Sequence, residues 1–90
     1  MIAMTTKNGK TVRLDADYHI DTGMAEYKVY CAGTRFIFPD FAPAARVYKD
    51  LSRIIEDGGK PNDRVIRLTT AARLMGYKVE EPGFCAKEVA

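Results

Sequence analysis

Residues 11–20 read TVRLDADYHI. Apolar side chains occupy every second position of this stretch, and mostly polar side chains occupy the positions between them. Strict alternation of this kind is typical of a strand with one buried face and one solvated face. The sequence therefore predicts a half-buried strand whose core side carries Val12, Leu14, Ala16, Tyr18 and Ile20.

Turn signals on both sides extend this strand into a meander. Asn8-Gly9 precedes it and is a strong hairpin signal, because both residues tolerate positive φ. Thr22-Gly23 follows it, after which the alternation resumes, and residues 32–34 form another tight-turn signal. We therefore expect four antiparallel strands, at about residues 2–6, 11–20, 25–31 and 35–38.

The period of the apolar residues changes from two to about 3.6 after Pro39. Asp40 is the expected N-cap of an amphipathic helix that Gly58-Gly59 ends. Gly76 marks the end of a second amphipathic segment. The pattern predicts a helix at residues 41–57, a second helix that residues 60–63 open and that runs to about residue 75, and a short final strand at residues 77–79.

These elements give the order β-β-β-β-α-α-β, an α+β fold with an antiparallel four- to five-stranded sheet and two helices packed on one face. A length of 90 residues corresponds to a single domain over residues 1–90, with about 80–90 as a loose tail. A chain of this size buries only about 60% of the surface that its unfolded form exposes. A second copy could add to its stability, so a homodimer is one expectation.

The net charge of +2, from 14 Lys and Arg against 12 Asp and Glu, is too small for a dedicated DNA-coating protein or a polybasic membrane binder. The charges are nevertheless separated along the chain. Residues 15–26 carry four acidic side chains and no Lys or Arg, whereas residues 60–78 carry five basic side chains against Asp63 alone. Because there is no apolar leader and no bilayer-spanning apolar run, we expect a cytoplasmic protein without a membrane partner.

The acidic stretch does not complete a metal-binding motif. Four carboxylates between Asp15 and Glu26 match positions 1, 3, 7 and 12 of a calcium loop, but position 6, which requires Gly, is Ile20. Alternation explains the same carboxylates, together with His19, as the solvated face of one strand. We therefore predict no metal site. The alternative is a transition-metal site on Asp15, Asp17 and His19, which share one strand face and would need further ligands from a neighbouring strand.

A catalytic site is not predicted either. The chain has one His and one Ser, and Ser52 lies on the polar side of the first helix, far in pattern from His19. Alternation points Cys31 toward the core and His19 toward solvent, which separates the members of a Cys–His dyad. Cys31 and Cys85 lack the spacing of a zinc or redox site, and the sequence leaves open whether they pair. We expect a protein that is not an enzyme and binds no cofactor.

Residues 68–77, LTTAARLMGY, resemble the first helix and turn of excisionase-type and MerR-type helix-turn-helix proteins. That resemblance implies a DNA-binding recognition helix directly after the turn. Residues 78–83 read KVEEPG, which is extended, acidic and interrupted by proline, so no recognition helix is carried over. Nucleic-acid binding through the second helix remains the alternative function, and its candidate residues are Arg64, Arg67, Arg73 and Lys78.

The basic residues of the first helix have a simpler interpretation. Arg46 and Arg53 each precede an aspartate by four residues, which predicts the ion pairs Arg46–Asp50 and Arg53–Asp57. A helix face paired in this way is typical of a solvated surface and offers little free positive charge.

Exposed apolar side chains remain as the candidate binding surface. Tyr30 and Ile37 lie on the strand face opposite the core and could meet across the third and fourth strands. Arg67 beside Leu74 forms a second candidate patch, and a terminal segment such as Phe84 is the alternative cover for either patch. We therefore expect a small non-catalytic protein that acts through protein–protein interaction. Its size and lack of motifs favour an inhibitor of host machinery encoded by a phage or other mobile element, a class that includes the anti-CRISPR inhibitors.

Overall fold

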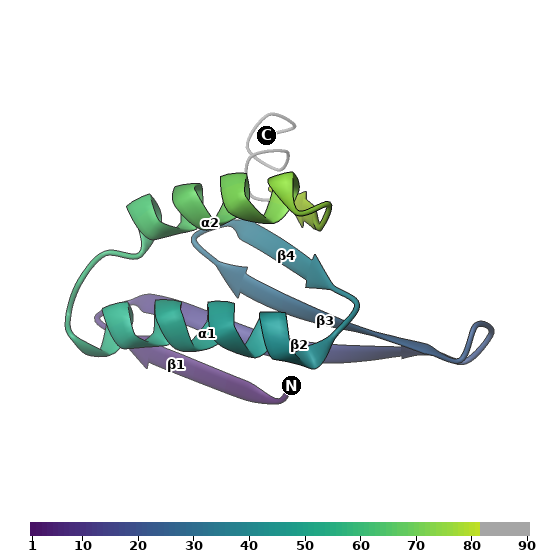
Figure 1. The fold of residues 1–90 in the computed structure, drawn as a ribbon. Helices are drawn as coiled ribbons and strands as arrows, with labels where there is room; N and C mark the ends of the chain where they lie inside the picture. The colour runs from purple at the N-terminus through teal and green to yellow at the C-terminus, as the bar shows by residue number, and fades with distance from the viewer. Residues whose placement is uncertain (82–90) are drawn as a thin grey trace, which may run out of the picture.

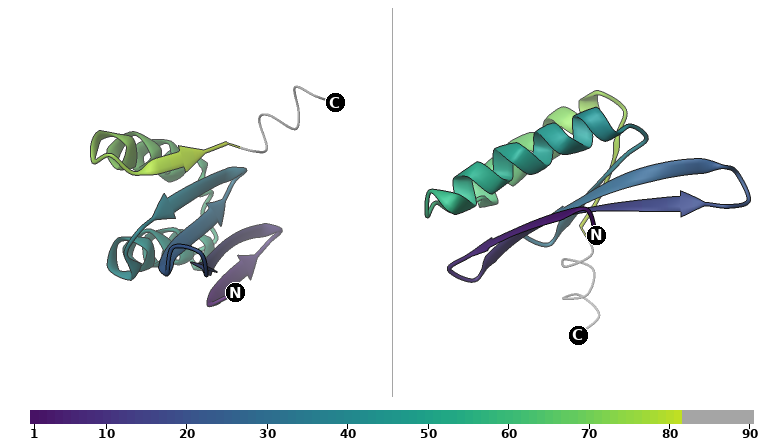
Figure 2. Two further views of the ribbon diagram at one scale, coloured as in Figure 1. Left: turned by 90° about the vertical axis from the view of Figure 1, so that its right-hand side faces the viewer. Right: turned by 90° about the horizontal axis from the view of Figure 1, so that it is seen from below.

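The computed structural model describes residues 1–81 and confirms the predicted α+β fold and element order. A five-stranded antiparallel sheet has the order β1-β2-β3-β4-β5, so each strand pairs with its neighbour in that order. Both helices lie on the same face of this sheet (Figure 1 and Figure 2). The elements are β1 (Ala3–Lys7), β2 (Lys10–His19), β3 (Met24–Cys31), β4 (Thr34–Phe38), α1 (Phe41–Glu56), α2 (Asn62–Leu74) and β5 (Lys78–Glu80).

Two tight turns set the register of the sheet. Asn8-Gly9 connects β1 to β2 with φ values of 54° and 78°, and Ala32-Gly33 connects β3 to β4 with values of 52° and 76°. Positive φ at both central residues is the requirement of a type I′ hairpin turn. With this register, one row of apolar side chains crosses all five strands on the face toward the helices: Ala3, Leu14, Val29, Phe36 and Val79. We call this set the cross-strand row.

The cross-strand row forms the floor of the core, and the helices cover it. Leu51 and Ile55 of α1, and Val65 and Ala72 of α2, are buried in the same cluster. α1 packs over β1 to β4, and α2 packs over β4 and β5. Full burial of an aliphatic side chain stabilises the folded state by about 1.5–3 kcal/mol, so these helix faces hold the two layers together.

Polar contacts fix β1 beneath α1, although β1 is an edge strand. The Thr5 hydroxyl is 2.8 Å from the hydroxyl of Tyr48 and 2.7 Å from the hydroxyl of Ser52. The Lys7 ammonium donates a hydrogen bond of 2.8 Å to the backbone carbonyl of Glu56, at the end of α1. β1 is therefore held to the helix layer at its middle and at its end.

The boundaries of α1 follow the predicted signals, with one difference. Asp40 is the N-cap residue and is extended, at φ −122° and ψ 150°, but its carboxylate makes no hydrogen bond to the helix. The predicted position of the cap is confirmed, whereas the capping bond is not formed. At the other end, Gly58 adopts a φ of 84° and donates its N–H to the Ile55 carbonyl at 3.0 Å.

The β2–β3 hairpin extends beyond the rest of the sheet, which corrects the prediction for its far end. Pairing of β1 with β2 stops at Leu14, and pairing of β3 with β4 stops at Tyr27. Beyond these residues the two strands project from the body without a neighbouring strand (Figure 1). Three side chains predicted for the core are exposed for this reason: Ala16, Tyr18 (67%) and Ile20 (86%). We call residues 16–26 the arm.

The boundary predicted for a loose tail falls inside a strand. Glu80 belongs to β5, where it lies opposite Arg35 and forms an ion pair with it. Residues 82–90 lie outside the described residues. Two hypotheses therefore concern residues outside the described range: that Phe84 covers an exposed patch, and that Cys85 is a partner of Cys31.

Replacement of Leu51 by alanine is expected to lower the free energy of unfolding by about 2–5 kcal/mol, because this side chain of α1 is completely buried in the core. Chemical denaturation followed by circular dichroism measures the loss. Leu74→Ala, at an exposed position of α2, is the control and should change the free energy by less than about 0.5 kcal/mol. An equally small change for Leu51→Ala would contradict the packing of α1 on the sheet.

Candidate functional site

The arm has an apolar face and a charged face, as the alternation of its two strands requires. Tyr18 and Ala25 lie opposite each other, on the side of the hairpin that faces the helices in the body of the sheet. The other side carries carboxylates, His19 and its cross-strand partner Met24. At the tip, Ile20 is joined by Met24, which is 60% exposed. Every residue from 18 to 24 is exposed.

An ion pair at the base of the arm and a hydrogen bond within it link the two strands on the charged face. Lys28 Nζ is 2.6 Å from Asp17 Oδ2, and His19 Nε2 is 2.8 Å from Glu26 Oε1. The hydrogen bond from Lys28 lowers the pKa of Asp17, and the same bond raises the pKa of Lys28. These positions agree with the prediction that the acidic stretch is the solvated face of a strand.

Hydrogen bonds also close the loop at the tip. The Gly23 N–H donates to the His19 carbonyl at 2.8 Å, and the Met24 N–H donates to the Thr22 hydroxyl at 3.3 Å. Gly23 has a φ of 70°, which glycine adopts without the steric penalty of a side chain. The loop therefore has a defined conformation that presents Ile20 and Met24 at the end of the arm.

Aromatic side chains continue the apolar face of the arm toward α1. Tyr27 lies diagonal to Tyr18 across the hairpin, on the same side of the sheet. Its ring meets the ring of Phe41 edge to face, with centroids 5.5 Å apart. Phe41, the first residue of α1, is 48% exposed. An aromatic surface therefore runs from the arm to the first residue of α1.

Tyr30 and Ile37, the first patch predicted from the sequence, lie on the outer face of the sheet. Their cross-strand neighbours are charged, since Tyr30 is opposite Arg35 and Ile37 is opposite Lys28. The Arg13 guanidinium lies 4.4 Å from the centre of the Tyr30 ring, a distance typical of a cation–π contact. The structure places the two apolar side chains diagonally, half-buried and surrounded by charges.

Arg67 and Leu74, the second predicted patch, are both exposed on α2. They are two turns apart in the sequence, so they lie on one stripe of the helix. Ile66 is also exposed on this helix, at 65%. These side chains stand on a helix packed against the sheet, whereas the apolar residues of the arm project beyond it.

Most of the basic residues proposed for nucleic-acid binding have partners within the chain. Arg64 Nη1 lies 2.6 and 2.7 Å from the two carboxylate oxygens of Asp50. Arg73 donates to a carbonyl of β5 at 3.4 Å, and Lys78 is 3.6 Å from a glutamate of the same strand. Arg67 lies on the exposed surface of α2. The carboxylates of Asp50 and Glu80 offset part of the positive charge of Arg64 and Lys78, whereas Arg67 and Arg73 keep theirs.

The pairing of Asp50 with Arg64 corrects the prediction for the first helix. Neither Arg46–Asp50 nor Arg53–Asp57 forms an ion pair among residues 1–81. Asp50 binds across to α2 because the two helices lie side by side on the sheet (Figure 1). A contact between elements thus replaces the expected contact along one helix.

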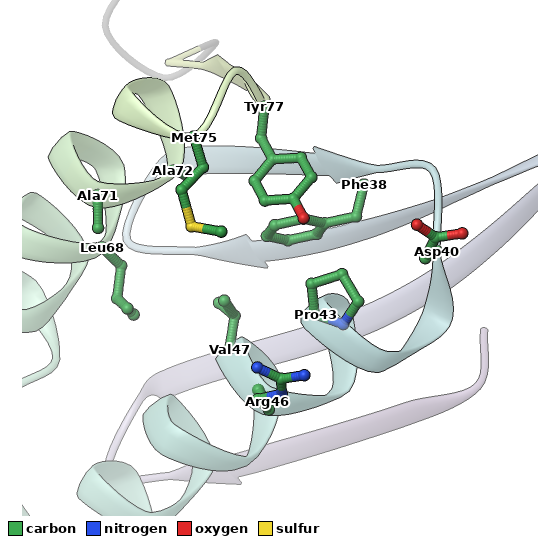
Figure 3. Close-up of a pocket in the computed structure, with 10 residues that line it drawn as sticks. All are labelled: Phe38, Asp40, Pro43, Arg46, Val47, Leu68, Ala71, Ala72, Met75 and Tyr77. Carbon is green, nitrogen blue, oxygen red and sulfur yellow. The ribbon is translucent and has the colours of Figure 1, made fainter.

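A groove that the sequence pattern did not predict lies between α1 and α2 (Figure 3). It has a volume of about 340 Å³, and apolar side chains such as Phe38, Val47 and Leu68 line most of it. Arg46 and Asp40 add one charge of each sign to the lining. The groove arises from the distance at which the helices pack, and no repeat within either helix encodes that distance.

The side chains whose chemistry could serve catalysis, which the sequence analysis separated, lie in three different places. His19 is on the charged face of the arm, and Cys31 faces the core, where burial raises the pKa of its thiol to about 11. Ser52 is bonded to Thr5 beneath α1. Within the described part of the chain, no group of three or more His, Cys, Asp or Glu side chains could hold a metal ion.

No helix formed by residues 1–81 is both long enough and apolar enough to cross a membrane. Comparisons with protein-family models, with curated proteins and with solved structures find no match to this chain.

Cys31 should be unreactive in the folded protein, because its thiol is buried and its pKa is raised to about 11. In a Cys85→Ser variant at pH 7, Ellman's reagent should react at least about tenfold more slowly with the folded chain than with the chain unfolded in guanidinium. The rate for the folded chain should rise as the pH approaches the raised pKa. Equal rates before and after unfolding would show that Cys31 is accessible in the native state.

Proposed function

We propose that this protein is a non-catalytic protein-binding module and that the arm is its main contact surface. The supporting observation is the exposure of Tyr18, Ile20 and Met24 on a hairpin that projects beyond the body of the sheet (Figure 1). Large apolar and aromatic side chains gathered on one projecting element are typical of anchors that enter a depression on a partner.

The charge of the arm favours a protein partner over nucleic acid. Residues 16–26 include Asp17, Asp21 and Glu26 and no Lys or Arg. Asp17 is paired with Lys28 and Glu26 is hydrogen-bonded to His19, so Asp21 at the tip is the carboxylate most available to a partner. Carboxylates repel a phosphate backbone, whereas a protein surface with an apolar depression and a basic rim complements both features of the arm. The partner that fits best is therefore a protein with a basic contact surface.

The conformation of the arm also favours binding. Its strands are linked by the Lys28–Asp17 and His19–Glu26 pairs, and its loop is closed by the hydrogen bond from Gly23 to His19. An element whose bound shape is already formed loses little conformational entropy on association. More of the free energy from burying the apolar tip then contributes to affinity.

Inhibition of host machinery is the form of this function that the charge supports. Basic surfaces of proteins commonly bind nucleic acids, and an acidic arm seated on such a surface would exclude them. We place this activity in the cytoplasm, where thiols such as Cys31 remain reduced. Direct nucleic-acid binding through Arg64, Arg67, Arg73 and Lys78 is less favoured, since carboxylates within the chain pair with Arg64 and Lys78.

Capture from host-cell lysate, with the purified chain as bait, tests the proposal. The wild-type chain should retain a protein partner after nuclease treatment and in moderate salt, and the double variant Ile20→Ser/Met24→Ser should lose it. With the purified partner, calorimetry should show affinity reduced at least about tenfold in this variant, because two exposed anchors are removed.

The double variant Ile66→Ser/Leu74→Ser is the matched control. It removes two exposed apolar side chains from α2 and should bind as the wild type does. Equal loss of affinity in both variants would contradict the arm as the contact surface. Loss of the captured material after nuclease treatment or in moderate salt would instead favour nucleic-acid binding through the basic residues of α2.

A further inference from the structure

The two edges of the sheet differ in how they are protected. β1 and β5 each have a neighbour on one side only, so each presents unpaired backbone N–H and C=O groups on the other side. Proteins protect such edges with short strands, charged side chains or proline. β5 has 3 residues and carries Lys78 and Glu80, which matches this rule.

β1 lacks this protection over most of its length. It has 5 residues, and Lys7 at its end is the only charged or proline residue among them. The Lys7 ammonium binds the carbonyl of Glu56, so its charge is directed toward the end of α1 and not along the open edge. The uncharged part of the strand therefore presents free backbone hydrogen-bonding groups beside apolar side chains.

The residues at the start of this edge are exposed and apolar. Met1, Ile2 and Met4 are 75%, 49% and 53% exposed. The hydroxyl contacts of Thr5 with α1 hold the strand in an extended, paired form from its inner side. β1 is thus a preformed template for one more strand, with apolar side chains that such a strand would cover.

We propose that the β1 edge pairs antiparallel with β1 of a second copy of this chain. A two-fold axis would join two five-stranded sheets into one continuous sheet. This pairing satisfies the open backbone groups of both copies with the same segment. The remaining edges of the two sheet bodies would be the β5 strands, which are short and charged, and β2 and β3 would stay without further neighbours along each arm, as they are in the single chain.

The charges along β1 are compatible with its pairing to itself. In an antiparallel pair about a two-fold axis, the two Lys7 side chains lie at opposite ends of the ribbon, each across from uncharged residues near the start of the other strand. No like charges then face each other, a condition that stabilises cross-strand neighbours. Met4 and Thr6, on the outer face, would lie near their counterparts in the other copy.

Sedimentation equilibrium tests this dimer. The wild-type chain should sediment with twice its mass of 10.1 kDa. Met4→Lys/Thr6→Lys should raise the dimer dissociation constant at least about tenfold, because four ammonium groups would gather along the shared strand pair. Ile66→Lys/Leu74→Lys adds the same charge at exposed positions of α2 and should leave the dimer unchanged.

A second measurement avoids any substitution. In a mixture of isotope-labelled and unlabelled wild-type chains, NMR should detect contacts between β1 protons of different chains, and amides on the open edge should exchange slowly with solvent. A monomeric wild-type chain, or a dimer that survives the β1 substitutions, would overturn the proposal. The proposal would also be overturned if the β1 amides exchanged slowly only when another protein supplied the pairing strand. The Ile20→Ser/Met24→Ser variant should still dimerise, which separates this test from that of the arm.

Discussion

Every part of the core depends on the cross-strand row, which begins at Ala3 and ends at Val79. Side chains alternate between the faces of a sheet, so a slip of one residue at either turn would move part of this row to the outer face. Asn8-Gly9 and Ala32-Gly33 prevent the slip, because their positive φ values suit a two-residue turn. Ala32 adopts a conformation that costs an L-residue about 1–2 kcal/mol, and the apolar burial that the register secures offsets this cost.

The same register accounts for the arm. β2 has 10 residues, whereas β1 and β4 have 5 each. The turns align the strands at one end, so the extra length of β2 and β3 emerges at the other end. An isolated pair of strands is only marginally stable in water. Cross-strand pairs such as Lys28–Asp17, together with the bonded loop at Gly23, supply the local contacts that neighbouring strands supply elsewhere.

Alternation predicts which face a side chain occupies, and it does not predict what covers that face. It places Tyr18 and Val12 correctly on one side of β2, yet only Val12 lies under the helices. The extent of the cover depends on where β1 and β4 stop pairing, which is a property of several segments together. The pairing of Asp50 with Arg64 and the groove between the helices were missed for the same reason, since both depend on the distance between α1 and α2.

The distribution of paired charges explains why the arm and the β1 edge stand out. On the outer face of the sheet, Arg13 pairs with Asp15 and Arg35 pairs with Glu80, so that face is largely neutralised within the chain. The arm retains exposed apolar side chains, and β1 retains unpaired backbone groups. These two surfaces use different interactions, since the arm offers side chains and β1 offers backbone hydrogen-bonding groups. A dimer paired through β1 would carry two arms, and binding of the first arm would raise the effective concentration of the second at a partner with two sites.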